Sequence, residues 1–362
     1  MKANLFSLLL LVGFSIPGVA QEVSAEQRRR VDTIFSRWDD FDKPGMAVGV
    51  IRNGSLILAD GYGQANLETG LGNGPDVIYR IGSTSKQFTA ACVALLALDG
   101  KLELGADIRT FFPEFPARDP AITVRHLIHH TSGLPDYIDL QFKAAGSGKA
   151  WFKPKDSLAA IAGAASEFAP GERFSYSNSN YLLLGEIVRN ASSLSLRDFA
   201  RARIFEPLGM ESTHFHDRHD EVVVGRSHGY SPQPEKGRGD WRVDITTLDH
   251  VGDGGVFTTI EDLARWDANF KDNTLGHGPA LLELMHTRGR LRDGSELDYA
   301  FGLIHGTLRG LKTVHHGGSW VGYRAQLLRI PGAALTVIVL SNQTTGNVTA
   351  LAQAVTDVFL DA

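Results

Sequence analysis

The chain has 362 residues, of which 43% are hydrophobic and 21% are charged, and its formal net charge is −5. This composition is typical of a globular protein and excludes a coiled coil or a disordered, low-complexity chain. The negative net charge gives no general attraction to nucleic acid or to an anionic membrane, so we expect neither as a partner.

The first residues have the three parts of a secretory signal peptide. Lys2 is followed by an apolar run over residues 5–16 and by small residues that end at Ala20. We therefore expect residues 1–20 to be removed and the mature chain to be periplasmic or secreted. Later apolar runs are too short to span a bilayer. Cys92 is the only cysteine, so we expect no internal disulfide and a buried, inert thiol.

The first predicted elements are a helix and a β-hairpin. Residues 24–40 begin with a Ser–Gln capping box and carry apolar side chains at helical spacing. Two apolar runs, 46–52 and 55–62, are joined by Asn53-Gly54. This dipeptide between two strand-like runs is a strong signal for a tight hairpin turn.

The middle of the chain is predicted to consist of helices joined by loops rich in Gly, Pro, Asp and Ser. The expected helices cover residues 88–98, 157–167, 181–190, 195–205 and 259–266. Extended structure then returns in four strand-like runs, at residues 299–308, 311–315, 322–330 and 335–340. A last helix is expected over residues 348–360.

Strands near both ends therefore bracket a helical middle. The economical architecture is an α+β fold, in which an antiparallel β-sheet is flanked by the N- and C-terminal helices and carries an inserted, mostly helical lobe. We expect residues 21–362 to form this domain. Its α/β lobe would comprise about residues 24–82 and 295–362, and its helical lobe about residues 83–294.

Ser83 and Lys86 lie at the start of the apolar helix predicted over residues 88–98. Side chains at i and i+3 are neighbours on one helical face, so the Lys86 amine can reach the Ser83 oxygen. A serine hydroxyl is a weak nucleophile until a base takes its proton, and a helix N-terminus stabilises an oxyanion formed there. Taken alone, the pair more often marks a capping serine followed by a solvated lysine.

Two further segments carry candidate site residues. Tyr176 and Asn178 follow a turn and precede a helix, so a loop can present a phenol and an amide beside a cationic amine. His315, Gly317 and Gly318 come at the end of a predicted strand, where glycines let backbone N–H groups approach an oxyanion. Each segment alone also fits a structural role, as a helix cap or a Gly-rich turn.

In combination and in this order, the three segments resemble the penicillin-recognising serine hydrolases, the S-x-x-K superfamily. The Tyr-x-Asn segment is similar to the branch that contains class C β-lactamases, DD-peptidases, D-amino-acid-specific peptidases and carboxylesterases with a β-lactamase fold. The resemblance covers nearly all of the mature chain. It implies the β-lactamase/transpeptidase-like fold and a reaction without a cofactor or a metal.

The resemblance also implies a role for each candidate residue. Ser83 would be the acylated nucleophile, Lys86 would activate it, and Tyr176 would be the general base and acid that serves the leaving group. Asn178 would hydrogen-bond the substrate. Whether Lys86 or Tyr176 takes the first proton stays open.

The third segment departs from the family pattern, because it reads His-His-Gly instead of Lys-Thr-Gly. The resemblance places His315 where β-lactamases have the lysine, with Gly317 beside it. The oxyanion hole would consist of the backbone N–H groups of Ser83 and Gly318. An imidazole is charged only below its ordinary pKa of about 6.5, so a preference for substrate carboxylates should fade as pH rises. The histidine argues against efficient β-lactamase activity.

The expected function is that of an exported serine hydrolase that cleaves an ester or an amide of a small molecule or peptide. Two activities are about equally supported: a D-amino-acid peptidase of the DD-carboxypeptidase type and a carboxylesterase. The alternatives are a weak β-lactamase and a non-catalytic penicillin-binding-like module that recognises peptidoglycan or a protein partner. The sequence leaves the oligomeric state open.

Two groups of histidines have a spacing that is also found in metal sites. His126, His129 and His130 have the spacing of ligands on one helical face, and residues 214–220 alternate His with Asp and Arg. We expect the first group to belong to a structural loop and the second to a polar surface loop, with no metal at either.

Overall fold

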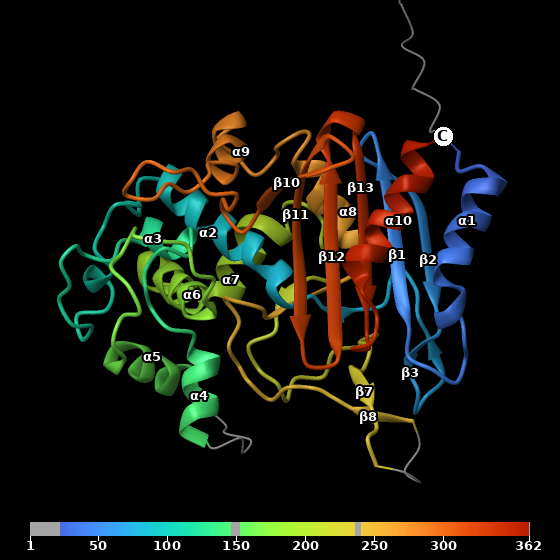
Figure 1. The fold of residues 1–362 in the computed structure, drawn as a ribbon, viewed down its shortest axis with the longest axis horizontal. Coiled ribbons are helices and arrows are strands. Elements are labelled where there is room, and N and C mark those ends of the chain that lie inside the picture. Colours follow the sequence, from blue (N-terminus) through green and yellow to red (C-terminus); the bar gives the residue numbers. More distant parts are fainter. Residues whose placement is uncertain (1–21, 146–152, 236–239, 362) are drawn as a thin grey trace, which may run out of the picture.

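The computed structural model describes residues 22–145, 153–235 and 240–361 (Figure 1). The predicted signal peptide and its cleavage site lie outside these residues. Across the described ranges, we find no helix whose length and apolarity would let it span a bilayer.

A six-stranded sheet forms the centre of one half of the molecule, in the order β10-β11-β12-β13-β1-β2. Every neighbouring pair is antiparallel. Positive φ values of 54° at Asn53 and 84° at Gly54 close the predicted first hairpin. The strands are β1 (Met46–Arg52), β2 (Ser55–Tyr62), β10 (Ile304–Leu308), β11 (Leu311–Trp320), β12 (Tyr323–Ile330) and β13 (Leu335–Ser341).

The terminal helices pack against one face of this sheet, as predicted. Helix α1 (Ala25–Phe35) begins at the capping box of Ser24 and stacks Phe35 on Tyr62 of β2, and α10 (Val348–Leu360) packs beside α1 against β12 and β13 (Figure 1). Val31, Leu328 and Val355 belong to the apolar core on this side. Helix α8 (Ile260–Asn269) contacts β1, β2 and β13 from the other face. The predicted α+β arrangement is therefore confirmed.

Helix α2 (Lys86–Leu98) is the centre of the helical lobe, and its first eleven residues are all buried. It contacts α6, α7 and α9, so the other helices pack around it. The lobe also contains α3 (Val124–Ile128), α4 (Tyr137–Ala145), α5 (Pro154–Gly163), α6 (Asn178–Ser192), α7 (Leu196–Ala200) and α9 (Pro279–Met285). Short 3-10 helices span Ser36–Trp38, Gly82–Ser85, Ile108–Thr110 and Pro331–Ala333, and a π-helical turn spans Arg201–Phe205.

The middle of the chain is less purely helical than predicted. Three small sheets accompany the main sheet, and two of them contain short strands from the region that was predicted to be helical. They are β3 (Gln64–Asn66) with β4 (Leu71–Gly72), β7 (Tyr230–Pro232) with β8 (Trp241–Val243), and β5 (Tyr79–Arg80) with β9 (Val256–Thr258) and β6 (His214–Phe215).

Element boundaries also differ at two places that matter for the site. Strand β11 does not end at His315 but continues through both glycines to Trp320, paired with β12 throughout. Helix α6 begins at Asn178, three residues before its predicted start, since Ser177 already has the extended backbone of an N-cap.

Candidate active site

Ser83 lies in the 3-10 turn of Gly82–Ser85 that connects β5 to helix α2. Gly82 has a φ of 51°, in the left-handed region that favours glycine. A Cβ atom on Gly82 would lie 2.8 Å from the backbone nitrogen of Ser319 in β11. The glycine therefore lets the turn carrying Ser83 pack directly against the edge of the sheet.

The Lys86 side chain is completely buried. Its amine lies 3.1 Å from Ser83 Oγ, 2.8 Å from Asn178 Oδ1 and 2.6 Å from the backbone oxygen of Asp253. An ammonium has three N–H donors, so these three oxygens satisfy it completely. In the neutral amine, the Ser83 hydroxyl can instead donate its proton to the nitrogen. The i, i+3 contact expected from the sequence is thus present.

Asn178 is held in place by Asp136, a residue that the sequence analysis did not single out. Asp136 Oδ2 accepts hydrogen bonds from the Asn178 backbone N–H at 2.7 Å and from its side-chain amide at 2.8 Å. The amide is therefore oriented with its oxygen toward Lys86. Burial raises the pKa of the Asp136 carboxyl, and the hydrogen bond from the Asn178 N–H opposes this shift. An aspartate directly after the Leu-Pro of the loop was the available signal.

Tyr176 faces the site from the loop before α6, with 38% of its surface exposed. The Lys86 amine lies 4.9 Å from the centroid of its ring. The ring stacks on the buried His130 at a centroid distance of 4.3 Å. His130 Nδ1 in turn accepts the Ser177 backbone N–H. Stacking and loop anchoring together hold the phenol beside the Ser83–Lys86 pair.

The placement expected for His315 is wrong, because its neighbour His316 faces this site. Successive side chains of a strand point to opposite faces. His315 pairs with Leu328, which belongs to the core beneath α1 and α10, whereas His316 pairs with Leu327, which belongs to the core shared with the helical lobe. The His316 ring lies 6.3 Å from the Tyr176 ring.

His316 is 4% exposed and is fixed by two hydrogen bonds. Its Nδ1 lies 2.6 Å from the Gly317 backbone oxygen, and its Nε2 lies 3.1 Å from the Tyr299 hydroxyl. The Gly317 oxygen can only accept, so Nδ1 carries the proton and Nε2 accepts from Tyr299. Burial, and secondly the charge of Lys86, lower the pKa of His316 to about 3. The ring is therefore neutral at ordinary pH.

The strand register also changes the expected oxyanion donor. Trp320 pairs with Tyr323 across a two-residue turn, so these residues exchange both backbone hydrogen bonds, and such pairs alternate along the strands. The N–H of Gly318 is therefore directed at Ala325 in β12. The N–H of Ser319 points away from β12, on the side where pairing with β10 has already ended at His315.

The free N–H next to Ser83 is thus that of Ser319 and not, as predicted, that of Gly318. Gly318 has a different role, because a Cβ atom there would lie 1.8 Å from the backbone oxygen of Ile81. Its lack of a side chain allows the close contact between β11 and the turn that carries the serine. Gly317 lines a hollow of about 440 Å³ together with Ser83, Tyr176 and His316. A second, narrower cavity of about 40 Å³ lies on the Asn178 side of Ser83.

The model of the Beta-lactamase family matches residues 31–359. The chain belongs to the Beta-lactamase family. This confirms the resemblance inferred from the sequence. Among the most similar proteins is the D-aminopeptidase of Gluconobacter oxydans, which is 30% identical over 315 residues, covering 86% of this chain and 58% of that protein. This chain therefore spans less than two thirds of the aminopeptidase.

Two other relatives extend the comparison of this Beta-lactamase family member. Penicillin-binding protein 4* of Bacillus subtilis is 29% identical over 332 residues, covering 88% of this chain and 72% of that protein. The structure of an octameric penicillin-binding protein homologue from Pyrococcus abyssi superposes with a TM-score of 0.79 at 27% identity, covering 93% of this chain and 77% of the other. These similarities support the same fold along nearly the whole described chain.

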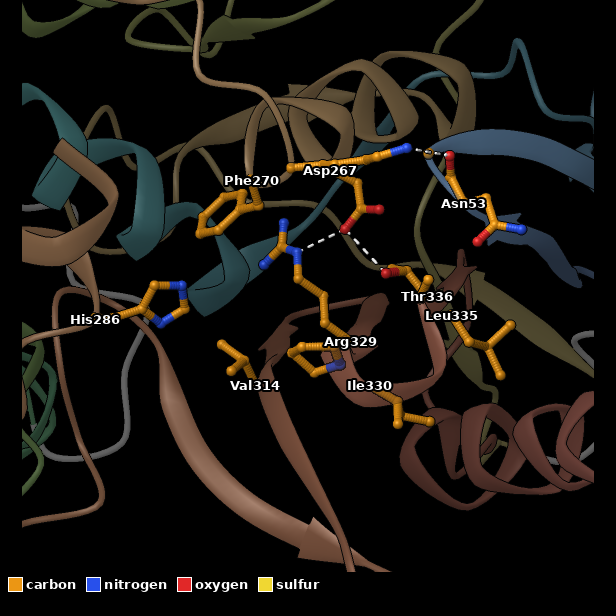
Figure 2. Close-up of a pocket in the computed structure, with 13 residues that line it drawn as sticks. Asn53, Asp267, Phe270, His286, Val314, Arg329, Ile330, Leu335 and Thr336 are labelled. Carbon is orange, nitrogen blue, oxygen red and sulfur yellow. Dashed lines mark hydrogen bonds and ion pairs between the residues drawn. The ribbon is translucent and has the colours of Figure 1, made fainter. Parts of the chain in front are cut away.

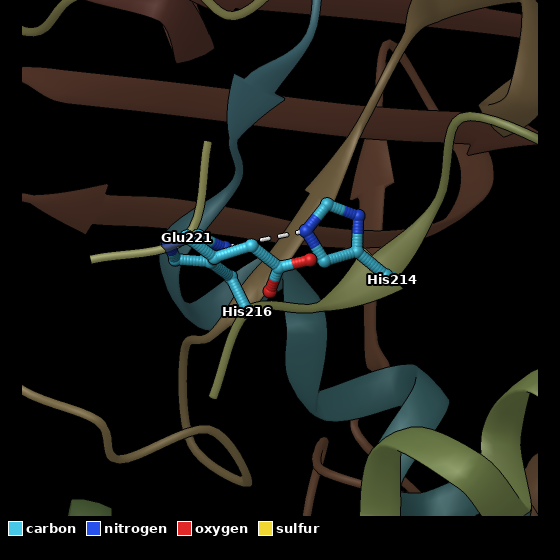
Figure 3. Close-up of side chains that lie close together, drawn as sticks. All are labelled: His214, His216 and Glu221. Carbon is cyan, nitrogen blue, oxygen red and sulfur yellow. Dashed lines mark hydrogen bonds between the residues drawn. The ribbon is translucent and has the colours of Figure 1, made fainter. Parts of the chain in front are cut away.

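One group of side chains in this Beta-lactamase family member has ligand atoms close enough to share a metal ion. His214 on β6 and His216 directly after it approach through Nε2 and Nδ1 at 3.3 Å, and the Glu221 carboxylate lies beside them (Figure 3). Both oxygens of Glu221 are bound by Arg197, at 2.5 and 2.7 Å. Arg197 thus already neutralises the one anionic ligand of this group.

The other histidine group, His126, His129 and His130, does not converge on one point, because each ring makes its own local hydrogen bonds. His126 Nδ1 accepts the Thr123 backbone N–H as part of a capping box, and His130 Nδ1 accepts the Ser177 backbone N–H. His129 contacts the backbone oxygens of Arg125 and Thr287. These three histidines therefore stabilise the backbone of the loop through hydrogen bonds to main-chain groups.

Proposed function

We propose that this Beta-lactamase family member is a serine hydrolase that cleaves an amide or ester through an acyl-enzyme on Ser83. The observation that carries this proposal is the 3.1 Å contact between Ser83 Oγ and the buried amine of Lys86. A lysine that merely capped or solvated the helix would extend into water. Here the amine is held against a serine at the junction of the two lobes, next to a hollow large enough for a substrate.

Acylation would begin with transfer of the Ser83 proton to Lys86 or to Tyr176. The freed Oγ attacks the substrate carbonyl carbon, and the electron pair of the C=O bond moves to its oxygen. The backbone N–H groups of Ser83 and Ser319 would stabilise this oxyanion. As the bond to the leaving group breaks, the proton passes to the leaving nitrogen or oxygen, for which Tyr176 is suitably placed beside Lys86.

Deacylation would use the same groups in the opposite sense. A water molecule in the hollow beside Tyr176 loses a proton to Lys86 or Tyr176, whichever acted as the base in acylation. The resulting hydroxide attacks the carbonyl carbon of the acyl-enzyme ester. The oxyanion again forms between Ser83 and Ser319, and Ser83 recovers its proton as the acid departs. Asn178, oriented by Asp136, would keep Lys86 in position and offer its amide to the substrate.

The substrate class we propose is a peptide or amide containing a D-amino acid. Support comes from the similarity to a D-aminopeptidase and to a penicillin-binding protein. A carboxylesterase activity remains the second candidate, because the hollow beside Ser83 also fits an ester. Export through the predicted signal peptide is part of the proposal. Turnover of D-alanine p-nitroanilide, its L-isomer and p-nitrophenyl acetate would separate the two candidates, with the D-anilide expected to be preferred over the L-anilide.

A covalent adduct on Ser83 is the direct test of the proposed reaction. A fluorophosphonate should add one phosphonyl group to the wild-type protein, measured by intact mass, because the Lys86 contact activates the Ser83 hydroxyl. Ser83→Ala should take up none. The matched control is Ser85→Ala, which removes the neighbouring hydroxyl that accepts the Val256 backbone N–H. It should still be labelled. Labelling that persists in Ser83→Ala would assign the nucleophile elsewhere, and no labelling of wild type would favour a non-catalytic module.

The buried, neutral His316 changes the expected pH dependence of substrate preference. The ratio of kcat/KM for N-acetyl-D-alanyl-D-alanine to that for its C-terminal amide should vary by less than about twofold between pH 5.5 and 8, because an imidazole with a pKa of about 3 does not change charge there. His316→Asn should lower kcat/KM about tenfold, because it removes the hydrogen bonds to Gly317 and Tyr299 that fix the wall of the hollow beside Ser83. His315→Asn, on the other face of β11, is the control and should stay within about twofold of wild type. If this ratio falls as the pH rises through 6.5, a histidine that titrates at its ordinary pKa would bind the substrate carboxylate, as the sequence analysis expected.

A further inference from the structure

Another cavity, of about 300 Å³, lies between helix α8 and the sheet. Its lining includes Val314 near the start of β11 and Arg329 near the end of β12 (Figure 2). Val314 and Arg329, a register pair, form its floor. Ser319 lies five positions beyond Val314 in β11, which corresponds to about 16 Å along the strand. The cavity is therefore distinct from the hollow at the proposed nucleophile.

The guanidinium of Arg329 is the unusual feature of this cavity. The residue is 5% exposed. Its Nε donates to Asp267 Oδ1 at 2.6 Å, and Asp267 also accepts from the Thr336 hydroxyl. The two terminal nitrogens, Nη1 and Nη2, are buried and have no hydrogen-bond partner among the described residues. Four N–H donors of a buried cation are thus left for something else to satisfy.

The surroundings direct these donors into the cavity. The Phe270 ring lies over the guanidinium at 3.9 Å from its centroid and covers one face of it. Figure 2 shows the terminal nitrogens extending toward Phe270 and the side on which His286 lies, away from the bond to Asp267. Arginine that is stacked and anchored through Nε presents its Nη groups as a fixed fork, which matches the two oxygens of a carboxylate.

The charge of the cavity favours an anion. Arg329 and Lys271 are its two cations and Asp267 its one carboxylate, which leaves a net charge of +1. Lys271 lies at the opening, where its amine donates to the Asn53 backbone oxygen at 3.0 Å. Burial, and then nearby His305, lower the pKa of His286 to about 4, so this ring adds no charge at neutral pH. A single negative charge would balance the cavity.

Most of the remaining wall is apolar and comes from Phe270, Val314, Ile330, Pro331 and Leu335. An inorganic anion would leave this surface in contact with water, whereas an apolar group attached to the anion would cover it. We propose that this cavity binds a small monocarboxylate with an apolar group, held by Arg329 and separate from the Ser83 site. The proposal does not depend on the activity assigned to Ser83.

The test uses 4-bromobenzoate and its neutral analogue 4-bromobenzamide as probes of the full-length mature protein. By titration calorimetry, the acid should bind at least about tenfold more tightly than the amide, because its contacts to Arg329 are charge-assisted. In crystals soaked with the acid, the anomalous signal of bromine should lie in the cavity between Phe270 and Val314. Prior phosphonylation of Ser83 should leave the affinity unchanged, so failure of the Ser83 assignment and failure of this site give different results.

Two variants assign the binding to Arg329. Arg329→Gln combined with Asp267→Asn removes both charges of the buried pair together and should abolish the preference for acid over amide. Arg309→Gln, which removes an exposed arginine paired with Asp357, should preserve it. Equal affinities for acid and amide, the absence of a bromine peak in the cavity, or a peak without saturable binding in solution, which indicates binding at crystal concentration only, would each overturn the proposal. The crystal measurement on wild type decides the matter even where the double variant does not fold.

Discussion

Replacing Lys86 with alanine should lower kcat by about 10²–10⁴-fold, the range for a lost proton-transfer group. The amine is the group in hydrogen-bond contact with both Ser83 Oγ and Asn178 Oδ1, so its removal leaves the hydroxyl without a base and the amide without its partner. Tyr176→Phe should lower kcat over the same range, since the Tyr176 ring lies directly beside the Lys86 amine, 4.9 Å from its centroid. Steady-state rates on a D-amino-acid anilide measure both effects.

The double variant Lys86→Ala/Tyr176→Phe tests whether the two residues act on one proton. It should be little slower than the slower single variant, because groups that serve the same proton path are strongly non-additive. Lys312→Ala, on the exposed part of β11, is the matched control and should retain wild-type kcat. Independent, multiplicative losses would mean that Lys86 and Tyr176 serve separate steps. Wild-type turnover by Tyr176→Phe would remove the phenol from the mechanism.

The fold could be predicted from the sequence where local signals and burial agree. The hairpin at Asn53-Gly54 and the capping box of Ser24 are local: each requires only residues within a few positions. The small sheet of β5, β6 and β9 could not be predicted, since its strands have two or three residues and pair across long stretches of chain. Strands this short show no detectable alternation of apolar and polar side chains. Their pairing depends on how the lobes pack.

The proximity of Ser83 and Lys86 could be predicted because helical spacing fixes it. Their relation to Tyr176 and Asn178 followed only from the family resemblance, since no local rule joins segments about ninety residues apart. The structure supplies the physical connection: Asp136 anchors the start of α6, and the Asn178 oxygen reaches the Lys86 amine.

The third segment shows where the sequence was ambiguous. His315 and His316 each begin a His-x-Gly pattern, so the spacing alone permits two registers. In a strand, a shift of one residue reverses the face of every side chain. The choice follows from the pairing of β11 with β12, which turns His316 toward the helical lobe and frees the N–H of Ser319. An expectation that the strand would end at His315 concealed this alternation.

Acidification should destabilise the protein steeply, because several imidazoles are buried in their neutral form. His130, His216 and His316 are each at most 4% exposed. Burial is the main cause that lowers their pKa values, to about 4 for His216, to about 3 for His316 and well below the usual range for His130. The Nδ1 atom of His130 accepts the Ser177 N–H, which is possible only for a neutral ring.

The sign follows from proton binding. Between the unfolded pKa of about 6.5 and the folded values near 4, the unfolded chain binds protons that the folded protein does not. The free energy of unfolding should therefore fall as pH falls through this window, by about 1.4 kcal/mol per pH unit for each such imidazole and about 4 kcal/mol per pH unit for the three. Asp136, whose pKa is raised by burial, opposes this trend. At this slope, a protein with a total stability of about 5–10 kcal/mol is expected to unfold between about pH 5.2 and pH 4.

Urea unfolding at pH 7.5, 6.5, 5.5 and 5.0 measures this slope. His216→Gln is the informative variant, because its ring stacks on Phe257 away from Ser83 and its loss leaves the proposed reaction untouched. The variant should lower the pH slope by about 1.4 kcal/mol per pH unit, the contribution of one imidazole, while keeping the same dependence on urea, because the surface exposed on unfolding does not change. A free energy of unfolding that stays level from pH 7 to pH 5 would contradict the neutral, buried state of these rings. It would require that their protonated forms find acceptors inside the folded protein, for which the unpartnered Nε2 atoms of His130 and His216 offer none among the described residues.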